Sequence, residues 1–156
     1  KIDMAPAFPA ASLDGYSSDG KYAYVARSSI VDGDSQLDAF SMSSGKYVGK
    51  LKLKAPLRVL DVLADPADDS KSPLVFVLVQ QGLNGNVELR AYSRPKLKLV
   101  STQPLTGTSF NANDAALHAV FYEDGGFFGD DKYVVIVSQP DKPTRSFFTK
   151  AFEMTL

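Results

Sequence analysis

Cysteine and tryptophan are absent from this sequence of 156 residues, and histidine occurs once. Without cysteine, disulfides, thiolate metal sites and thiol nucleophiles are excluded. No apolar run reaches the roughly 18 residues that a membrane-spanning helix needs, so we expect no membrane span. Charge of one sign is not in excess, because 17 basic residues stand against 18 acidic ones. That balance provides no electrostatic basis for binding nucleic acid.

The length and composition fit one globular domain. Hydrophobic residues make up 44% of the sequence and charged residues 22%, and a chain of this size buries roughly two thirds of its unfolded surface. The first residue is Lys1 and not methionine. Removal of a signal peptide would explain this start and would make the protein secreted or luminal, whereas excision from a longer chain is the other explanation. The compartment therefore stays open.

Strand patterns fill the sequence, and amphipathic helical periodicity is scarce. Short runs rich in Val, Tyr, Phe and Leu alternate with clusters of Gly, Pro, Asp, Asn and Ser, which is typical of strands separated by turns. We therefore predict a single all-β domain over residues 1–156.

The strand runs recur as a unit of four. The units cover about residues 10–54, 57–103 and 115–156, and their second strands are predicted to begin at Tyr22, Leu74 and Tyr133. Four-stranded antiparallel units at this period are the signature of β-propeller blades. The turn Ser17–Lys21 is then the connection between the first two strands of a blade.

The two ends of the sequence bear on how many blades there are. The third unit lacks a fourth strand, and residues 1–5 resemble the fourth strand of another blade. We therefore predict about three blades, a partial propeller, since known rings use roughly four or more. Such a chain would be part of a longer propeller, or two copies would form a six-bladed ring. A β-sandwich is the alternative fold.

Two motifs carry a resemblance to known repeats. Residues 17–27, SSDGKYAYVAR, closely resemble the core of YVTN and lactonase-like propeller repeats. Residues 36–53, QLDAFSMSSGKYVGKLKL, look like the remainder of such a repeat and also resemble a WD-repeat blade without its Trp-Asp dipeptide. The resemblance implies a propeller fold and no particular activity, because such propellers include lactone hydrolases, cofactor-bearing oxidoreductases, surface proteins and scaffolds.

One set of polar residues falls on the predicted first strands. Asp14, Asp61 and His118 occupy similar places in the three units, and the first strand of a blade lines the central channel. Two carboxylates and an imidazole could bind a divalent cation there or act as acid and base. Counting back from the turns gives an alignment that differs by one residue, which would turn a side chain to the opposite face. The structural interpretation is that these groups bond to backbone or water between blades.

Two acidic turns are weak calcium candidates. Their residues are Asp65, Asp68 and Asp69 in one turn and Glu123, Asp124, Asp130 and Asp131 in the other. Neither has the regular ligand spacing of a calcium loop, so we interpret both as solvated turns and predict no metal or cofactor. Within the second turn, Phe127 and Phe128 are flanked by glycines. An exposed aromatic pair of this kind would contact a protein partner.

The preferred functional hypothesis is a non-catalytic protein-interaction or scaffold domain, part of a larger chain or assembly. Its partners would be another protein or a second copy bound through open blade edges, which are prone to pairing. A lone histidine and the lack of a Gly-x-Ser-x-Gly motif argue against a serine hydrolase. The alternative is a lactonase-like propeller hydrolase with its site at Asp14, Asp61 and His118, dependent on a divalent metal.

Overall fold

The described part of the chain forms three antiparallel sheets. The computed structural model describes residues 11–29, 33–65, 74–82, 86–105, 116–123, 132–141 and 146–155. Sheet A has the order β1-β2-β3-β4, sheet B the order β5-β6-β7-β8 and sheet C the order β11-β10-β9. Their strands are β1 (Ala11–Ser18), β2 (Tyr22–Ser29), β3 (Ser35–Ser41), β4 (Tyr47–Leu53), β5 (Leu57–Ala64), β6 (Leu74–Gln81), β7 (Val87–Ser93), β8 (Leu99–Pro104), β9 (Ala116–Glu123), β10 (Lys132–Asp141) and β11 (Ser146–Thr155).

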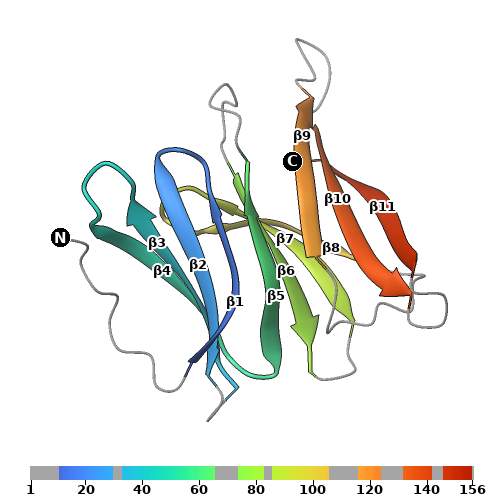
Figure 1. The fold of residues 1–156 in the computed structure, drawn as a ribbon, viewed down its shortest axis with the longest axis horizontal. Helices are drawn as coiled ribbons and strands as arrows, with labels where there is room; N and C mark the ends of the chain where they lie inside the picture. The colour runs from blue at the N-terminus through green and yellow to red at the C-terminus, as the bar shows by residue number, and fades with distance from the viewer. Residues whose placement is uncertain are drawn as a thin grey trace.

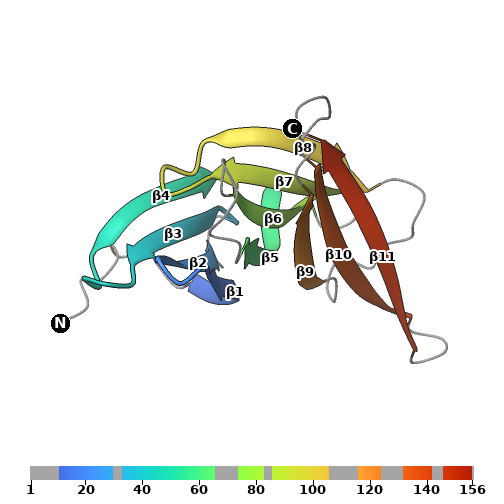
Figure 2. The same ribbon diagram turned by 90° about the horizontal axis from the view of Figure 1, so that it is seen from above.

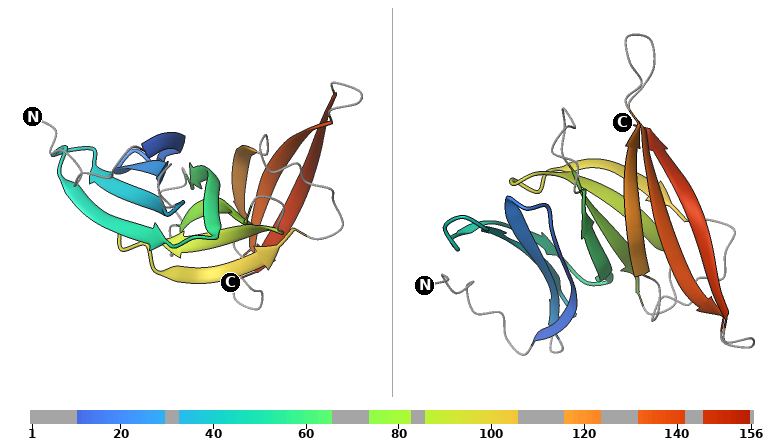
Figure 3. Two further views of the ribbon diagram at one scale, coloured as in Figure 1. Left: turned by 90° about the horizontal axis from the view of Figure 1, so that it is seen from below. Right: turned by 45° about the horizontal axis from the view of Figure 1, so that its top comes forward.

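The sheets stand next to one another in chain order (Figure 1). Seen from above, they fan out along an arc, with β1, β5 and β9 on its inner side and β4, β8 and β11 on its outer side (Figure 2). The view from below shows the same arc (Figure 3). The first strand of every sheet is therefore its inner edge, so residues far apart in sequence meet there.

A β-bulge interrupts the inner strand of each sheet. In β1 the pairing passes over Asp14, in β5 over Leu60 and in β9 over His118. A bulge leaves one residue without a cross-strand partner and bends its strand. Because the bulge recurs, the three inner strands can be aligned on it. Asp14, Leu60 and His118 then occupy equivalent positions.

The sheets pack face to face in one repeating manner. Sheet A contributes Tyr24 and Leu37 to a buried cluster, where they meet Val75, Val77 and Val79 of β6. The opposite face of the same strand contributes to a second buried cluster, which joins sheet B to sheet C; its members from β6 and β10 are Leu74, Phe76, Leu78, Tyr133, Val135 and Val137. β6 is thus buried on both faces, which explains its continuous apolar run.

The all-β class and the antiparallel four-stranded units are confirmed. The described strands form no closed sheet, and face-to-face sheets also occur in β-sandwiches. β10 starts at Lys132, one residue before the predicted Tyr133. β8 starts at Leu99, and Leu97 before it takes a left-handed conformation with φ 53° and is buried. The strand predicted over residues 1–5 lies outside the described residues.

One structural finding bears on the predicted absence of a membrane span. Within the described ranges, no helix has the length and apolarity that crossing a membrane requires.

Candidate functional site on the inner strands

Asp14 lies at the bulge of β1, where its carboxylate accepts a hydrogen bond from the Ser28 hydroxyl of β2. The Ser28 hydroxyl also contacts that of Ser35, with 2.8 Å between the two oxygens. Ser35 Oγ accepts a bond of 3.2 Å from the backbone N–H of Val59 in sheet B. The carboxylate thus begins a hydrogen-bonded chain that runs from sheet A to the inner strand of sheet B.

Asp61 joins sheet B to sheet C. Its Oδ2 accepts a 2.8 Å bond from the N–H of Leu117, and its Oδ1 a 2.8 Å bond from the N–H of Val62. Burial raises the pKa of Asp61 above its usual value, although the two backbone bonds and the nearby His118 act in the opposite direction. Gly15 of sheet A comes so close that a Cβ there would lie 2.7 Å from Asp61 Oδ1. A glycine at this bulge therefore lets the inner strands of sheets A and B approach.

His118 is the bulge residue of β9 and is exposed. Its Nε2 contacts the hydroxyl of Ser138, a buried residue of β10. The imidazole is therefore hydrogen-bonded within sheet C.

When the inner strands are aligned by their bulges, the three predicted site residues do not all occupy equivalent positions. Asp14 and His118 are equivalent, whereas Asp61 comes one residue after the bulge position Leu60. Across the described residues, no group of three or more His, Cys, Asp or Glu side chains is placed to hold a metal ion. The carboxylates accept bonds from serine and from backbone amides. The two carboxylates thus link adjacent sheets, whereas His118 bonds within sheet C.

The raised pKa of Asp61 predicts how its effect on stability depends on pH. The folded state favours the protonated carboxyl, so its contribution is fully present below about pH 3.9, the unfolded pKa. It is lost as the pH rises through the higher folded pKa. We therefore expect the free energy of unfolding of the natural protein, relative to Asp61→Asn, to fall between pH 3.5 and pH 7. Urea titrations of both proteins at the two pH values measure this difference, and an increase would contradict it.

A buried ionic cluster, which sequence reasoning missed, joins the turn Ser18–Lys21 to sheet B. Asp19 Oδ1 accepts bonds of 2.8 and 2.7 Å from the N–H groups of Lys21 and Tyr22. Its Oδ2 accepts a 3.1 Å bond from the Tyr24 hydroxyl and pairs with the Arg94 guanidinium. The Asp19 side chain is fully buried and that of Arg94 is 7% exposed. Burial and the Asp19 carboxylate raise the pKa of Tyr24 far above its usual value.

Part of this cluster could be predicted from the sequence. Asp at the start of an Asp-Gly turn commonly bonds its own backbone, and the Asp19 carboxylate does so here. Nothing in the sequence pairs Asp19 with Arg94, which belongs to another repeat.

A second cluster lies within sheet A. Asp38 is buried, pairs with Arg27 and accepts a 2.7 Å bond from Gln36 Nε2. Burial first, and Asp38 second, raise the pKa of Tyr47 on the neighbouring strand. These charged groups are confined to β2, β3 and β4, so they hold sheet A together.

The remaining predicted sites are mostly beyond the described residues. Asp65 is described and is 1% exposed, so its interpretation as a solvated turn residue was wrong. The backbone carbonyl of Asp65 accepts a 3.2 Å bond from Arg94 Nη1, and its N–H donates to Leu74 at 3.1 Å. The other acidic turn residues, Asp68, Asp69, Asp124, Asp130 and Asp131, lie outside the described residues, as do Phe127 and Phe128.

No protein-family model matches the sequence, and no curated protein matches it. The fold and the residue contacts of this chain are therefore the basis for inferring its function.

Proposed function

We propose that this chain is a non-catalytic protein-interaction domain whose sheets are blades of a propeller related to the YVTN, lactonase-like or WD repeats. One observation carries the proposal. Where a propeller enzyme would have its site, Asp61 of the inner strand β5 binds sheet C. Asp14 of the inner strand β1 begins a hydrogen-bonded chain through Ser28 and Ser35 to sheet B. Functional contacts are then left to the ends of the sheets, as is common for loops on a rigid scaffold.

The end of sheet A that carries the turns β1–β2 and β3–β4 has a rigid backbone. The N–H of Met42 donates to the carbonyl of Lys21 at 2.8 Å, which ties the two turns together. Within the second turn, Gly45 N–H donates to Ser41 at 2.8 Å, and Ser41 N–H donates to Lys46 at 2.8 Å.

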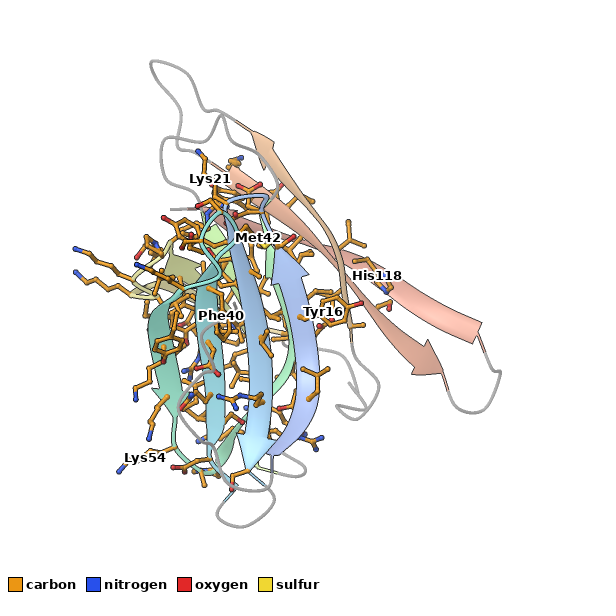
Figure 4. The ribbon with its side chains drawn as sticks, turned by 60° about the vertical axis from the view of Figure 1, so that its left-hand side comes forward. Tyr16, Lys21, Phe40, Met42, Lys54 and His118 are labelled. Carbon is orange, nitrogen blue, oxygen red and sulfur yellow. The ribbon has the colours of Figure 1, made fainter. Side chains whose placement is uncertain are left out.

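The side chains at this end point outward. Lys21 and Met42 are exposed and lie together at the end of the sheet opposite Lys54 (Figure 4). A cation beside an exposed thioether on a fixed backbone suits a protein partner, because little entropy is lost when a pre-organised surface binds.

Site-specific photo-crosslinking in extracts of the producing cells tests this function. A benzoyl-phenylalanine at Ser44, in the β3–β4 turn, should give a discrete heavier adduct that mass spectrometry identifies as a different protein. The matched control is the same group at Lys54, which is also exposed but lies at the other end of sheet A. Equal adducts at both positions, or none at Ser44, would overturn the proposal.

A further inference from the structure

One face of sheet A carries apolar residues that are not buried. Leu13 is 64% exposed and Tyr16 76%, and Met42 at the end of β3 is 53% exposed. Together with Ala23 and Val25 they line a depression of about 500 Å³. We call this surface, completed by Phe40, the open face of sheet A. Tyr16, Phe40 and Met42 lie over it in Figure 4. Exposed apolar groups gathered in this way mark an interaction surface.

The equivalent face of sheet B is buried. Val25 pairs with Asp38 in sheet A as Val77 pairs with Arg90 in sheet B, and Ala23 pairs with Phe40 as Val75 pairs with Tyr92. Val75, Val77 and Tyr92 are at most 2% exposed, because sheet A packs on them.

Sheet C has the same side covered. Tyr133, Val135 and Val137 are buried against sheet B. The open face of sheet A is therefore equivalent to the faces of sheets B and C on which the preceding sheet packs.

At the other end of the arc, sheet C presents its opposite face, the one that does not pack on sheet B. In β10 the residues that alternate with the buried set are Lys132, Val134 and Ile136, which are only half-buried. In sheets A and B the equivalent face packs on the next sheet, and Tyr24 and Phe76 belong to these contacts. Within the described residues, one face of each kind is thus uncovered.

From these two faces we infer that a second copy of this chain docks its sheet C, through Val134 and Ile136, on the open face of sheet A. The contact is made twice about a two-fold axis, so two chains close a ring of six sheets. A ring of that size falls within the range of known propellers. A closed symmetric dimer also leaves neither face exposed, whereas a single contact would grow into a filament.

The inner edges support the same arrangement. The amide just before the bulge is Val59 in β5 and Leu117 in β9. Each donates to a side chain of the preceding sheet, to Ser35 and Asp61 respectively. Such contacts protect an edge strand from unwanted pairing. The equivalent residue of β1 is Leu13, at the margin of the open face, where the docked sheet C would lie.

The inference depends on the blade-like stacking in the proposed function. It shares Met42 with the turn surface assigned to partners, but its test substitutes no residue of that surface. Its test is the solution mass of the full chain by light scattering, together with sedimentation equilibrium. We expect twice 16.9 kDa. Tyr16→Glu and Ile136→Glu should each weaken self-association by about 100-fold or more, since each buries an unpaired charge at the contact. Leu99→Glu, at an exposed site on the outer strand of sheet B, is the matched control and should stay dimeric.

Mixing the two variants identifies the faces that meet. Tyr16→Glu retains an intact sheet C, and Ile136→Glu retains an intact open face, so an equimolar mixture should regain dimers through one of its two contacts. Circular dichroism and urea midpoints of each variant show that it folds. A folded monomer, or a dimer indifferent to both substitutions, would overturn the inference, as would a dimer that Tyr16→Glu alone abolishes and mixing does not restore. None of these results affects the crosslinking at Ser44, so the two proposals fail separately.

Discussion

Replacement of Asp19 by alanine is expected to lower the free energy of unfolding by about 3–5 kcal/mol, the usual result of removing one partner of a buried ion pair. The side chain of Asp19 is fully buried and that of its partner Arg94 is 7% exposed. Without the carboxylate, the guanidinium keeps only its bond to the carbonyl of Asp65 among the contacts described. Its Nε has no hydrogen-bond partner among the described residues even in the intact protein. A loss of this size is a large part of the roughly 5–15 kcal/mol that stabilises a typical domain.

Urea unfolding followed by circular dichroism measures the effect. Ser44→Ala is the matched control, because Ser44 is a turn residue of the same sheet that bonds only its own loop, over 3.4 Å to the N–H of Lys46. It should change the free energy by no more than about 0.5 kcal/mol. A loss below about 1 kcal/mol for Asp19→Ala would show that the ion pair is well solvated and contributes little.

A double-mutant cycle shows whether Arg94 is the reason. Removing both charges with Asp19→Ala and Arg94→Met should cost less than the sum of the two single changes, because no unpaired charge is then buried. Additive costs would assign the effect to the turn itself, through the N–H groups of Lys21 and Tyr22.

The strands themselves were predictable because they depend on local properties of the sequence. Alternation of apolar and polar residues, with Asp-Gly and Ser-Gly turns between the runs, indicates antiparallel strands. β2 and β6 accordingly begin where the pattern predicts, at Tyr22 and Leu74. The continuous apolar run of β6 is the pattern of a strand buried on both faces, although it was not used to predict the stacking.

The candidate site was less predictable because it depends on bulges. A bulge inserts one residue and exchanges the faces of every residue beyond it. Leu13-Asp14 and Leu60-Asp61 look alike in sequence, yet the bulge falls on Asp14 in one strand and on Leu60 in the other. No residue type in these strands indicates which residue forms the bulge. Contacts between sheets, such as Asp19 with Arg94, join residues of different repeats and have no local signal at all.

Substitution of Phe76 by alanine is the second large effect that we expect, with a loss of about 3–5 kcal/mol in the free energy of unfolding. Phe76 is completely buried between sheets B and C, and its ring lies 5.2 Å from that of Tyr133 at an angle of 55°. Truncation removes apolar burial and leaves a cavity in a closely packed layer. Phe76→Leu retains most of the volume and should lose considerably less. Leu99→Ala, at a residue 48% exposed in the same sheet, should lose no more than about 0.5 kcal/mol.

Hydrogen exchange shows where the loss acts. Sheet C has three strands, and its described buried apolar side chains belong to the cluster that it shares with sheet B. If that contact is its main support, amides of β9 and β10 should exchange faster in Phe76→Ala than in the natural protein, and by a larger factor than amides of β2 and β3. Equal acceleration in both sheets would mean that the three sheets unfold as one unit, with the energy of the contact shared among them. A loss below about 1.5 kcal/mol would contradict the contact itself, because a side chain that packs on Tyr133 cannot be removed at so small a cost.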